Sequence, residues 1–298
     1  MVTAIWIALI IMAVWYGTIF FKDFMKHKDK LENCSWTKVG LIGFIVNFFD
    51  VLGIGAFAPQ AALLKFTKQT EDRVIPGTMN ISNTVPVLLQ AIIFIKIIEV
   101  DAITLIVMLA TATAGAIIGA GVVAKLPERK IQLTMGIALF ATAFIMLSSM
   151  MGWMPAGGNT IGLTGGKLII AAVANFILGA LMTAGIGLYA PCMALVFVLG
   201  MSPAVAFPIM MGSCAFLMPP ASIKFIKEGA YNRKSALGMA IPGSIGVLIA
   251  AFVVKSLPLN ILRWVVMAVV VYTSIVMLRA AAKNKDKKEK VTLANNAN

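Results

Sequence analysis

Long apolar runs constrain what this chain can fold into more than any other feature of its sequence. A helix needs about 20 apolar residues to cross a hydrocarbon core of about 30 Å. Of the 298 residues, 60% are hydrophobic and 12% are charged, against about 25% charged residues in soluble domains. The sequence therefore predicts an all-α polytopic membrane protein. The runs long enough to span are residues 2–21, 74–98, 102–124, 131–153, 204–225, 235–254 and 259–282.

The first run resembles a secretion signal in position but not in pattern. It has no basic segment before it, it is longer than an ordinary signal core, and no A-x-A-like cleavage site follows it. We therefore expect residues 1–35 to form an extra N-terminal transmembrane helix followed by a basic cytoplasmic loop.

Two further apolar regions, residues 39–64 and 168–199, are interrupted by similar motifs. GIGAFAP occupies residues 53–59 and GIGLYAP occupies residues 185–191, 132 positions later. Glycine is favoured just past the end of a helix and proline at the start of the next one. Each motif therefore predicts a helix end, a turn and a new half-helix, which begins near Pro59 in the first copy and near Pro191 in the second.

Basic residues indicate how these broken regions are threaded, because Lys and Arg accumulate in cytoplasmic loops. If both regions cross the membrane fully, the loops at 65–73 and 125–130 face outward, against this rule. If each region is a re-entrant hairpin that returns to its own side, these loops, the loop at 227–234 and the C-terminal tail are all cytoplasmic. We therefore expect a multi-pass protein of the inner cell membrane with a cytoplasmic C-terminus.

The re-entrant threading places the two hairpins upside down relative to each other, as in the inverted repeats of many secondary transporters. Matching prolines support a duplication of about 130 residues, since Pro76 and Pro208 have the same spacing as the two motifs. Each repeat comprises a broken hairpin and three transmembrane helices. The predicted divisions are residues 1–35, repeat 1 at 36–154, repeat 2 at 155–282 and a disordered polar tail at 283–298.

The breaks also predict a binding site. Irregular backbone persists in a membrane only where it is buried in protein or lines a watery cavity. Two half-helix N-termini that converge near the midplane suit an anion, because they present free amides and positive dipole ends. Alternatively, the glycines only permit close helix packing.

Polar residues in the spans after the breaks, within NISNT at 80–84 and GSC at 212–214, are candidate hydrogen-bond donors to an oxyanion. They could instead bond to neighbouring helices. The full set of candidate substrate-binding residues is Gly53, Gly55, Ala58, Pro59, Gln60, Asn80, Ser82, Asn83, Gly185, Gly187, Ala190, Pro191, Cys192 and Ser213.

Asp50 lies within an apolar segment, three residues before the first motif. A carboxylate inside the membrane is a functional candidate by default, and Asp50 could carry a coupling proton or bind a coupling cation such as sodium. It could equally be hydrated near the cytoplasmic mouth, or cap a backbone group together with Asn47.

Several classes of function are excluded. The only histidine, His27, lies in a basic loop, so histidine-based catalysis and multi-histidine metal sites are not expected. No phosphate-binding loop occurs, so we expect no cofactor and no ATP-driven step. The net charge of +13 resides in short loops and the tail, where it orients the protein and contacts anionic lipid rather than nucleic acid.

The three cysteines are scattered, which argues against a disulfide framework. Cys192 and Cys214 occupy the repeat positions of Gln60 and Ser82, so a thiol site is conceivable, although small buried residues of this kind are more often packing elements.

The broken hairpins ending in proline, the span after each, and the KEGAYN loop together resemble the sulfite exporter TauE/SafE family of membrane transporters over residues 36–282. Members usually carry a denser Gly-x-Gly-Gly-Gly run, whereas alanines and the aromatic residues Phe57 and Tyr189 stand in these motifs. The resemblance implies export or uptake of small sulfur anions such as sulfite, sulfoacetate or other sulfonates.

The combined features favour a secondary transporter, a permease or exporter for a small anion that works by alternating access between the repeats. An anion channel that uses the same half-helix ends is the alternative, and an intramembrane enzyme is disfavoured. Direction of transport and oligomeric state stay open, and an oligomer is possible.

Overall fold

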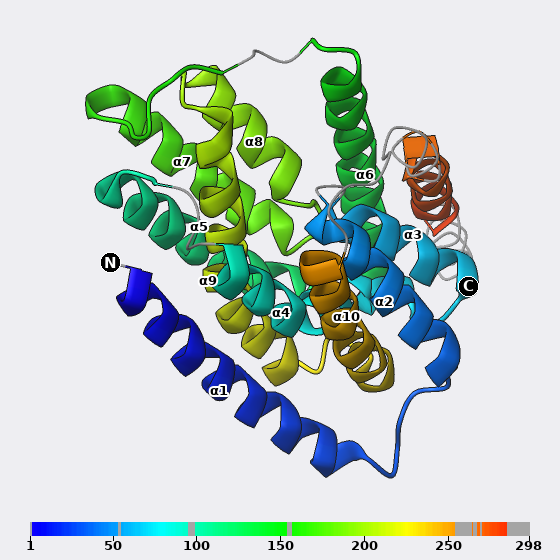
Figure 1. The fold of residues 1–298 in the computed structure, drawn as a ribbon. Coiled ribbons are helices and arrows are strands. Elements are labelled where there is room, and N and C mark those ends of the chain that lie inside the picture. Colours follow the sequence, from blue (N-terminus) through cyan, green and yellow to red (C-terminus); the bar gives the residue numbers. More distant parts are fainter. Residues whose placement is uncertain are drawn as a thin grey trace.

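The computed structural model describes residues 2–52, 55–94, 99–153, 157–253, 264, 267–268 and 270–284. Several predictions fall partly outside these ranges, namely Gly53 of the first motif, most of the C-terminal tail and parts of the predicted spans 74–98, 235–254 and 259–282. The described residues form helices and no named strand, which confirms the all-α prediction (Figure 1). Residues 270–284 are helical as well. The named helices are α1 (Val2–His27), α2 (Trp36–Val51), α3 (Phe57–Thr67), η1 (Asp72–Val74), α4 (Ile75–Phe94), α5 (Ala102–Val123), α6 (Glu128–Met150), α7 (Gly165–Met182), α8 (Tyr189–Val198), α9 (Pro203–Lys227) and α10 (Arg233–Val253).

Six of the described helices are long and apolar enough to cross a membrane. They are α1, α5, α6, α7, α9 and α10. Length and composition therefore confirm a multi-pass membrane protein.

Two helices are too short to span. At about 1.5 Å per residue, α3 with its 11 residues is about 16 Å long and α8 with its 10 residues about 15 Å, or half the hydrocarbon thickness. Each follows a break that contains a glycine in the left-handed region, Gly55 with φ 87° and Gly185 with φ 103°. Only glycine adopts such a conformation without strain, so these two positions explain why the helices stop here.

The new half-helices begin slightly earlier than the prolines suggested. Helix α3 begins at Phe57 and α8 at Tyr189, which places Pro59 and Pro191 third in their helices. The prolines are tolerated there because the first four N–H groups of a helix have no partner within it.

In each pair of helices, α2 with α3 and α7 with α8, the start of the first helix lies close to the end of the short second helix. Ahead of α2, the Ser35 amide donates to the side chain of Gln69, which follows α3, with 2.8 Å between N and Oε1. Around α7 and α8, the Ser202 amide donates to the Thr160 carbonyl at 2.9 Å. The two ends of each hairpin therefore lie side by side.

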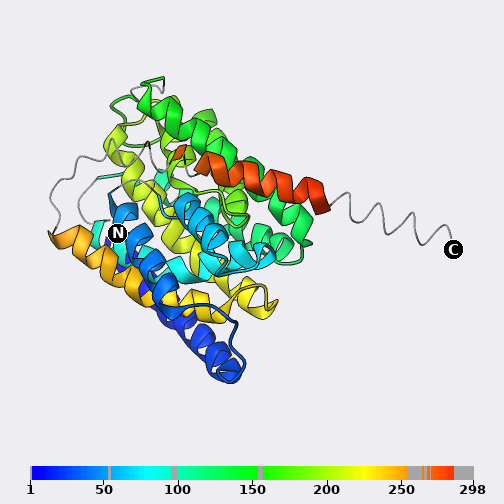
Figure 2. The ribbon, with the colours of Figure 1, turned by 90° about the vertical axis from the view of Figure 1, so that its right-hand side faces the viewer.

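The two halves of the chain are α2–α6 and α7 to residue 284, and helices of one half pack against helices of the other. Helix α2 packs against α10, and α7 packs against α5. Helices α4 and α9 contact each other, where the Thr84 and Ser222 hydroxyls are 2.9 Å apart. The helix at 270–284 lies against α6, and the Ser274 hydroxyl donates to the Gly136 carbonyl at 2.6 Å (Figure 2).

Helix α1 lies outside this arrangement, against α9 and α4 (Figure 1). Its buried Tyr16 hydroxyl donates to the Ile81 carbonyl of α4 at 2.7 Å. Pro86, also inside α4, lacks an N–H, so the ladder of this helix is incomplete at the neighbouring Ser82 carbonyl.

Glycines allow the closest helix contacts. A Cβ on Gly115 of α5 would overlap the Phe176 carbonyl of α7, and a Cβ on Gly179 would overlap the Ala112 carbonyl. Small residues let helix backbones approach in membranes, where dispersion and close packing replace the hydrophobic drive. Close packing is therefore the role of these glycines, which lie outside the two motifs.

Replacing Gly115 by alanine should force α5 and α7 apart and destabilise the fold by about 1–3 kcal/mol, the usual cost of overpacking. Gly121 lies on the same helix with nothing within 4 Å of a Cβ, so Gly121→Ala is the matched control. Thermal unfolding in detergent should show a lower Tm for the first variant only. Equal Tm values would contradict the tight contact.

Candidate functional site

A cavity lies where the two breaks meet. Gly55 and Ala56 of the first break and Gly187 and Leu188 of the second all line it. Its volume is about 140 Å³, and a water molecule needs about 10–15 Å³ measured in this way. The cavity therefore has room for a small anion with part of its hydration shell.

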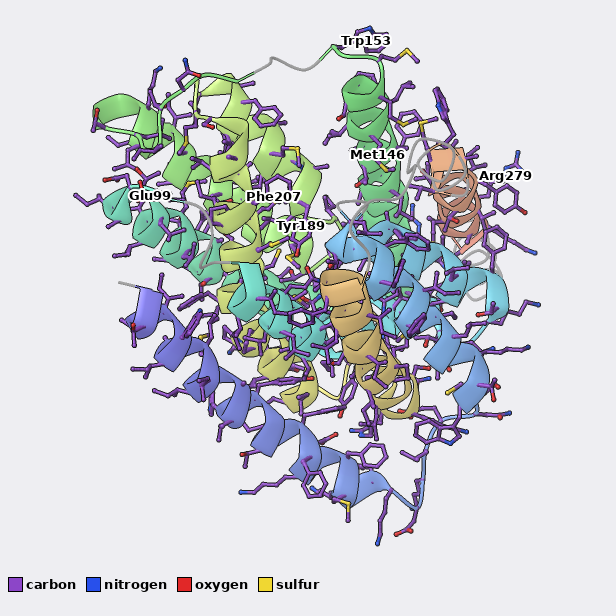
Figure 3. The ribbon with its side chains drawn as sticks, in the orientation of Figure 1. Glu99, Met146, Trp153, Tyr189, Phe207 and Arg279 are labelled. Atoms are coloured by element: carbon purple, nitrogen blue, oxygen red, sulfur yellow. The ribbon has the colours of Figure 1, made fainter. Side chains whose placement is uncertain are left out.

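Helix α6 forms another wall of this cavity. Thr142, Met146, Ser149 and Met150 line it from the C-terminal half of the helix. Tyr189 lies near the middle of the molecule, Met146 lies farther up along α6, and Trp153 marks the upper end of that segment (Figure 3). The cavity therefore extends from the breaks toward the Trp153 end of α6. No feature of the sequence singled out α6 as a cavity wall.

Both half-helices contribute their first turns to the cavity. Phe57 and Ala58 of α3 and Tyr189 and Ala190 of α8 line it. N–H groups in a first turn have no partner within their helix and carry the positive end of the helix dipole. The two short helices thus place partial positive charge at one cavity from two directions.

Asp50 lies at the end of α2 with 3% of its surface exposed, and it also lines the cavity. Its Oδ1 accepts the Ala56 amide at 2.7 Å, and its Oδ2 accepts the Gln90 side-chain amide at 2.7 Å. The carboxylate therefore caps the backbone of the first break. Asp50 is buried at the end of α2 and not exposed in a loop, and it caps Ala56 without Asn47.

A chain of hydrogen bonds continues from Asp50 to the second break. The Tyr189 hydroxyl donates to Oε1 of Gln90 at 3.0 Å. Ala56, Asp50, Gln90 and Tyr189 therefore form one buried chain between the two motifs. Sequence reasoning missed Gln90, although a lone glutamine within the apolar run 74–98 is the kind of residue that marks a functional position in a membrane span.

The electrostatics of the cavity are unusual for an anion site. Among the described residues that line it, Asp50 is the one with a formal charge, and no Lys, Arg or His is present. Any attraction for an anion must therefore come from backbone amides, helix dipoles and hydroxyl groups. An ionised Asp50 would oppose anion binding.

Three of the predicted polar residues form a separate buried cluster behind the first half-helix. Gln60 Nε2 donates to the Ser82 hydroxyl at 2.8 Å, and Asn83 Nδ2 donates to Gln60 Oε1. Asn47 joins the cluster by donating to Asn83 Oδ1 at 3.0 Å. These side chains hold α2, α3 and α4 together rather than reaching the cavity.

Asn80 and Ser213 also bond to protein groups and do not line the cavity. Asn80 donates to the Pro76 carbonyl at 2.9 Å, and Ser213 accepts from Asn175 at 3.2 Å. Asp50, Gly55, Ala58, Gly187 and Ala190 line the cavity. Those that do not line it are Pro59, Gln60, Asn80, Ser82, Asn83, Gly185, Pro191, Cys192 and Ser213, while Gly53 lies outside the described residues.

Metal-ligating side chains do not gather in the part of the chain that the structure describes, where no three His, Cys, Asp or Glu residues form a group. The described cysteines Cys34, Cys192 and Cys214 are buried and free.

Comparison with known proteins bears directly on this site. The family model of the sulfite exporter TauE/SafE matches residues 1–146 and 168–297, which is nearly the whole chain and includes both breaks. The chain belongs to the TauE/SafE family. No curated protein and no solved structure matches it at a significant level. TauE/SafE proteins are membrane transporters and not enzymes, so the resemblance carried by the two motifs is confirmed.

Gly187 offers a direct test of the cavity. Its φ lies outside the left-handed region, and an added Cβ would meet only Phe57 Cβ, at 3.7 Å. The leucine of Gly187→Leu should therefore be accommodated by the fold but should occupy cavity space. We expect transport to fall by at least about ten-fold, because a single displaced group at a binding site is worth that much.

The control is Gly17→Leu, since Gly17 of α1 has nothing within 4 Å of a Cβ and lies far from the cavity in sequence. Substrate flux in proteoliposomes and Tm in detergent are measured for both variants. Full transport by Gly187→Leu would show that the cavity is not on the transport path.

Proposed function

We propose that this TauE/SafE protein is a secondary transporter that moves a small sulfur anion, of the sulfite or organosulfonate type, through the cavity between the breaks. The observation that carries the proposal is that both half-helices begin at one cavity, with Ala58 and Ala190 in its wall. Helix N-termini are suited to anions because their amides and dipoles point at the ligand. The family assignment supports a sulfur anion as the class of substrate.

We further propose that residues 36–154 and 155–282 are inverted repeats that move relative to each other. The packing supports this division. If α2 is equivalent to α7 and α5 is equivalent to α10, then the α2–α10 contact is equivalent to the α7–α5 contact. Both contacts are present. The α4–α10 and α9–α5 contacts form a second such pair. In known inverted-repeat transporters, one repeat rocks against the other around a central site.

Re-entrant hairpins are part of the same proposal. Each short helix is half as long as a span, and each hairpin returns to its starting point through the contacts of Ser35 with Gln69 and of Thr160 with Ser202. The chain enters α2 from the end at which α1 finishes and enters α7 from the end at which α6 finishes (Figure 1). This arrangement supports hairpins that enter from opposite sides of the inner cell membrane, with the C-terminus in the cytoplasm.

Labelling of single cysteines tests this topology. Glu71, after the first hairpin, and Trp153, after α6, are both exposed, while the described native cysteines are buried and should give little background. A membrane-impermeant maleimide added to intact cells should label Trp153→Cys but should label Glu71→Cys only after permeabilisation. Labelling of Glu71→Cys in intact cells would overturn the threading.

Coupling follows from the charge of the cavity. An anion that enters beside ionised Asp50 is repelled, and the repulsion is strong in a site with little water. Protonation of Asp50 removes it, so we propose that the anion moves together with a proton. Tyr189 and Cys214 are the other titratable side chains among the described residues that line the cavity with Asp50. Sodium is the alternative coupling ion.

The chain through Gln90 explains how this protonation would reach the second break. Ionised Asp50 accepts from Gln90 Nε2, and Gln90 Oε1 accepts from Tyr189. A protonated Asp50 donates instead, so the Gln90 amide must turn over and donate to the Tyr189 oxygen. Proton binding at the first break thus reverses a hydrogen bond at the second.

Asp50→Asn tests the coupling. An asparagine retains the size of the side chain and can still accept the Ala56 amide, but it cannot exchange a proton. In proteoliposomes loaded with radiolabelled sulfite or a sulfonate, gradient-driven accumulation should fall to the level of empty liposomes, while exchange of substrate across the membrane continues.

Two outcomes would contradict this mechanism. Accumulation by Asp50→Asn at the wild-type rate would remove Asp50 from coupling. Conduction that follows the anion gradient alone in the wild-type protein would favour the alternative anion channel.

A further inference from the structure

Sulfur atoms are distributed unevenly around the cavity. Every sulfur-containing residue in its wall comes from α6 to α9, and none of the described lining residues from α2 to α4 contains sulfur. We call this set the sulfur wall. It comprises Met146, Met150, Met182, Met193, Met210 and Cys214.

Comparison of equivalent positions in the two motif-bearing segments shows that this asymmetry is chemical as well as spatial. At the spacing of 132 residues, Asp50 corresponds to Met182, Gln60 to Cys192 and Ser82 to Cys214. An oxygen- or nitrogen-bearing side chain in the first half is therefore replaced by a sulfur-bearing one in the second half at all three positions. Such a replacement is not required for packing, since serine and cysteine have nearly the same shape.

Contacts within each set follow the same division. In the first half, Gln60 Nε2 donates to Ser82 Oγ at 2.8 Å. In the second half, the Cys214 thiol lies 3.7 Å from the Met182 sulfur. Both residues of this sulfur pair line the cavity, whereas Gln60 and Ser82 do not.

The second half-helix also differs in its electrostatics. Asp50 covers the start of the first break by accepting the Ala56 amide, but Met182, 132 residues later, offers only an uncharged thioether, which is a weak acceptor. The amides ahead of α8 are therefore not covered by a carboxylate of the kind that occupies the first break. A ligand at the second break would therefore contact sulfur atoms and backbone amides together.

Sulfur in the wall disfavours hard, strongly hydrated anions. A thioether has no proton to donate and is a weak acceptor, so it returns nothing for the water that an oxyanion loses. No Lys or Arg is present among the described lining residues to offset that loss. A soft and polarisable group, in contrast, gains dispersion energy against methionine and cysteine sulfur.

We propose that the cavity selects an anion that combines an oxyanion group with an exposed, unoxidised sulfur atom, the class to which thiosulfate belongs. The terminal sulfur atom lies against Met182 and Cys214, with the thiol donating a weak hydrogen bond to it, and the oxygen atoms face the backbone of the breaks. This inference rests on the proposed function as a sulfur-anion transporter and narrows its substrate.

Competition binding to the purified full-length protein tests the selectivity. Thiosulfate, sulfite and sulfate are titrated in turn, and affinity is read from the shift in Tm, because a ligand stabilises the state that it binds. Thiosulfate should bind more tightly than sulfite and sulfate by about ten-fold, a difference of about 1.4 kcal/mol. Equal affinities for the three anions would overturn the inference.

Two substitutions test the sulfur pair. Met182→Leu retains volume and Cys214→Ser retains shape, so neither should impair folding strongly. Each should reduce the preference for thiosulfate over sulfite by several-fold, read as the ratio of the two affinities in the same variant. Met108→Leu is the control, because Met108 is equally buried on α5 but does not line the cavity. An unchanged preference in both cavity variants would also overturn the inference.

The same titrations separate failure of this inference from failure of the proposed function. If sulfite or a sulfonate is bound and transported without preference for thiosulfate, only the sulfur-wall inference fails. If none of these anions binds or is transported, the proposed function itself fails. Stabilisation by silver(I) in the absence of any response to anions would show a soft-cation site and would overturn both.

Discussion

A backbone amide that leaves its helix inside a membrane must find a partner, because an unsatisfied polar group in hydrocarbon costs several kcal/mol. Both breaks of this protein are arranged around that constraint. Asp50 caps Ala56 at the first break, and residues of both breaks line a shared cavity. The two short helices can be shorter than a full span because their first turns meet protein groups and this cavity.

The two halves of the chain therefore present different chemical groups to the cavity. The first half places a carboxylate at its break and connects it through Gln90 to Tyr189 of the second half. The second half carries Met182 and Cys214, each 132 residues after Asp50 and Ser82 respectively. Under the proposed function, the first half senses protonation and the second recognises the substrate, and the Gln90 chain links the two events.

Much of the fold could be predicted from the sequence because the relevant forces are local. Apolar length predicts helices that can span, and the left-handed glycines at 55 and 185 stop helices where the motifs indicated. The site was harder to predict. Gln60, Ser82 and Asn83 are polar and adjacent to a break, as expected of ligands, yet they bond to one another. A helix turns by about 100° per residue, so nearness in sequence does not decide which side chain faces a cavity.

The sequence by itself determined that this is a multi-pass membrane protein, where both breaks lie and to which family it belongs. Apolar composition indicates the membrane, and the Gly-Pro motifs act through short-range backbone conformation. Only the tertiary structure decided that the two breaks meet at one cavity, that α6 closes its side, and that Gln90 joins Asp50 to Tyr189. These features depend on how helices far apart in the chain are rotated and packed against one another, and that packing is set by contacts such as those of Gly115 and Gly179.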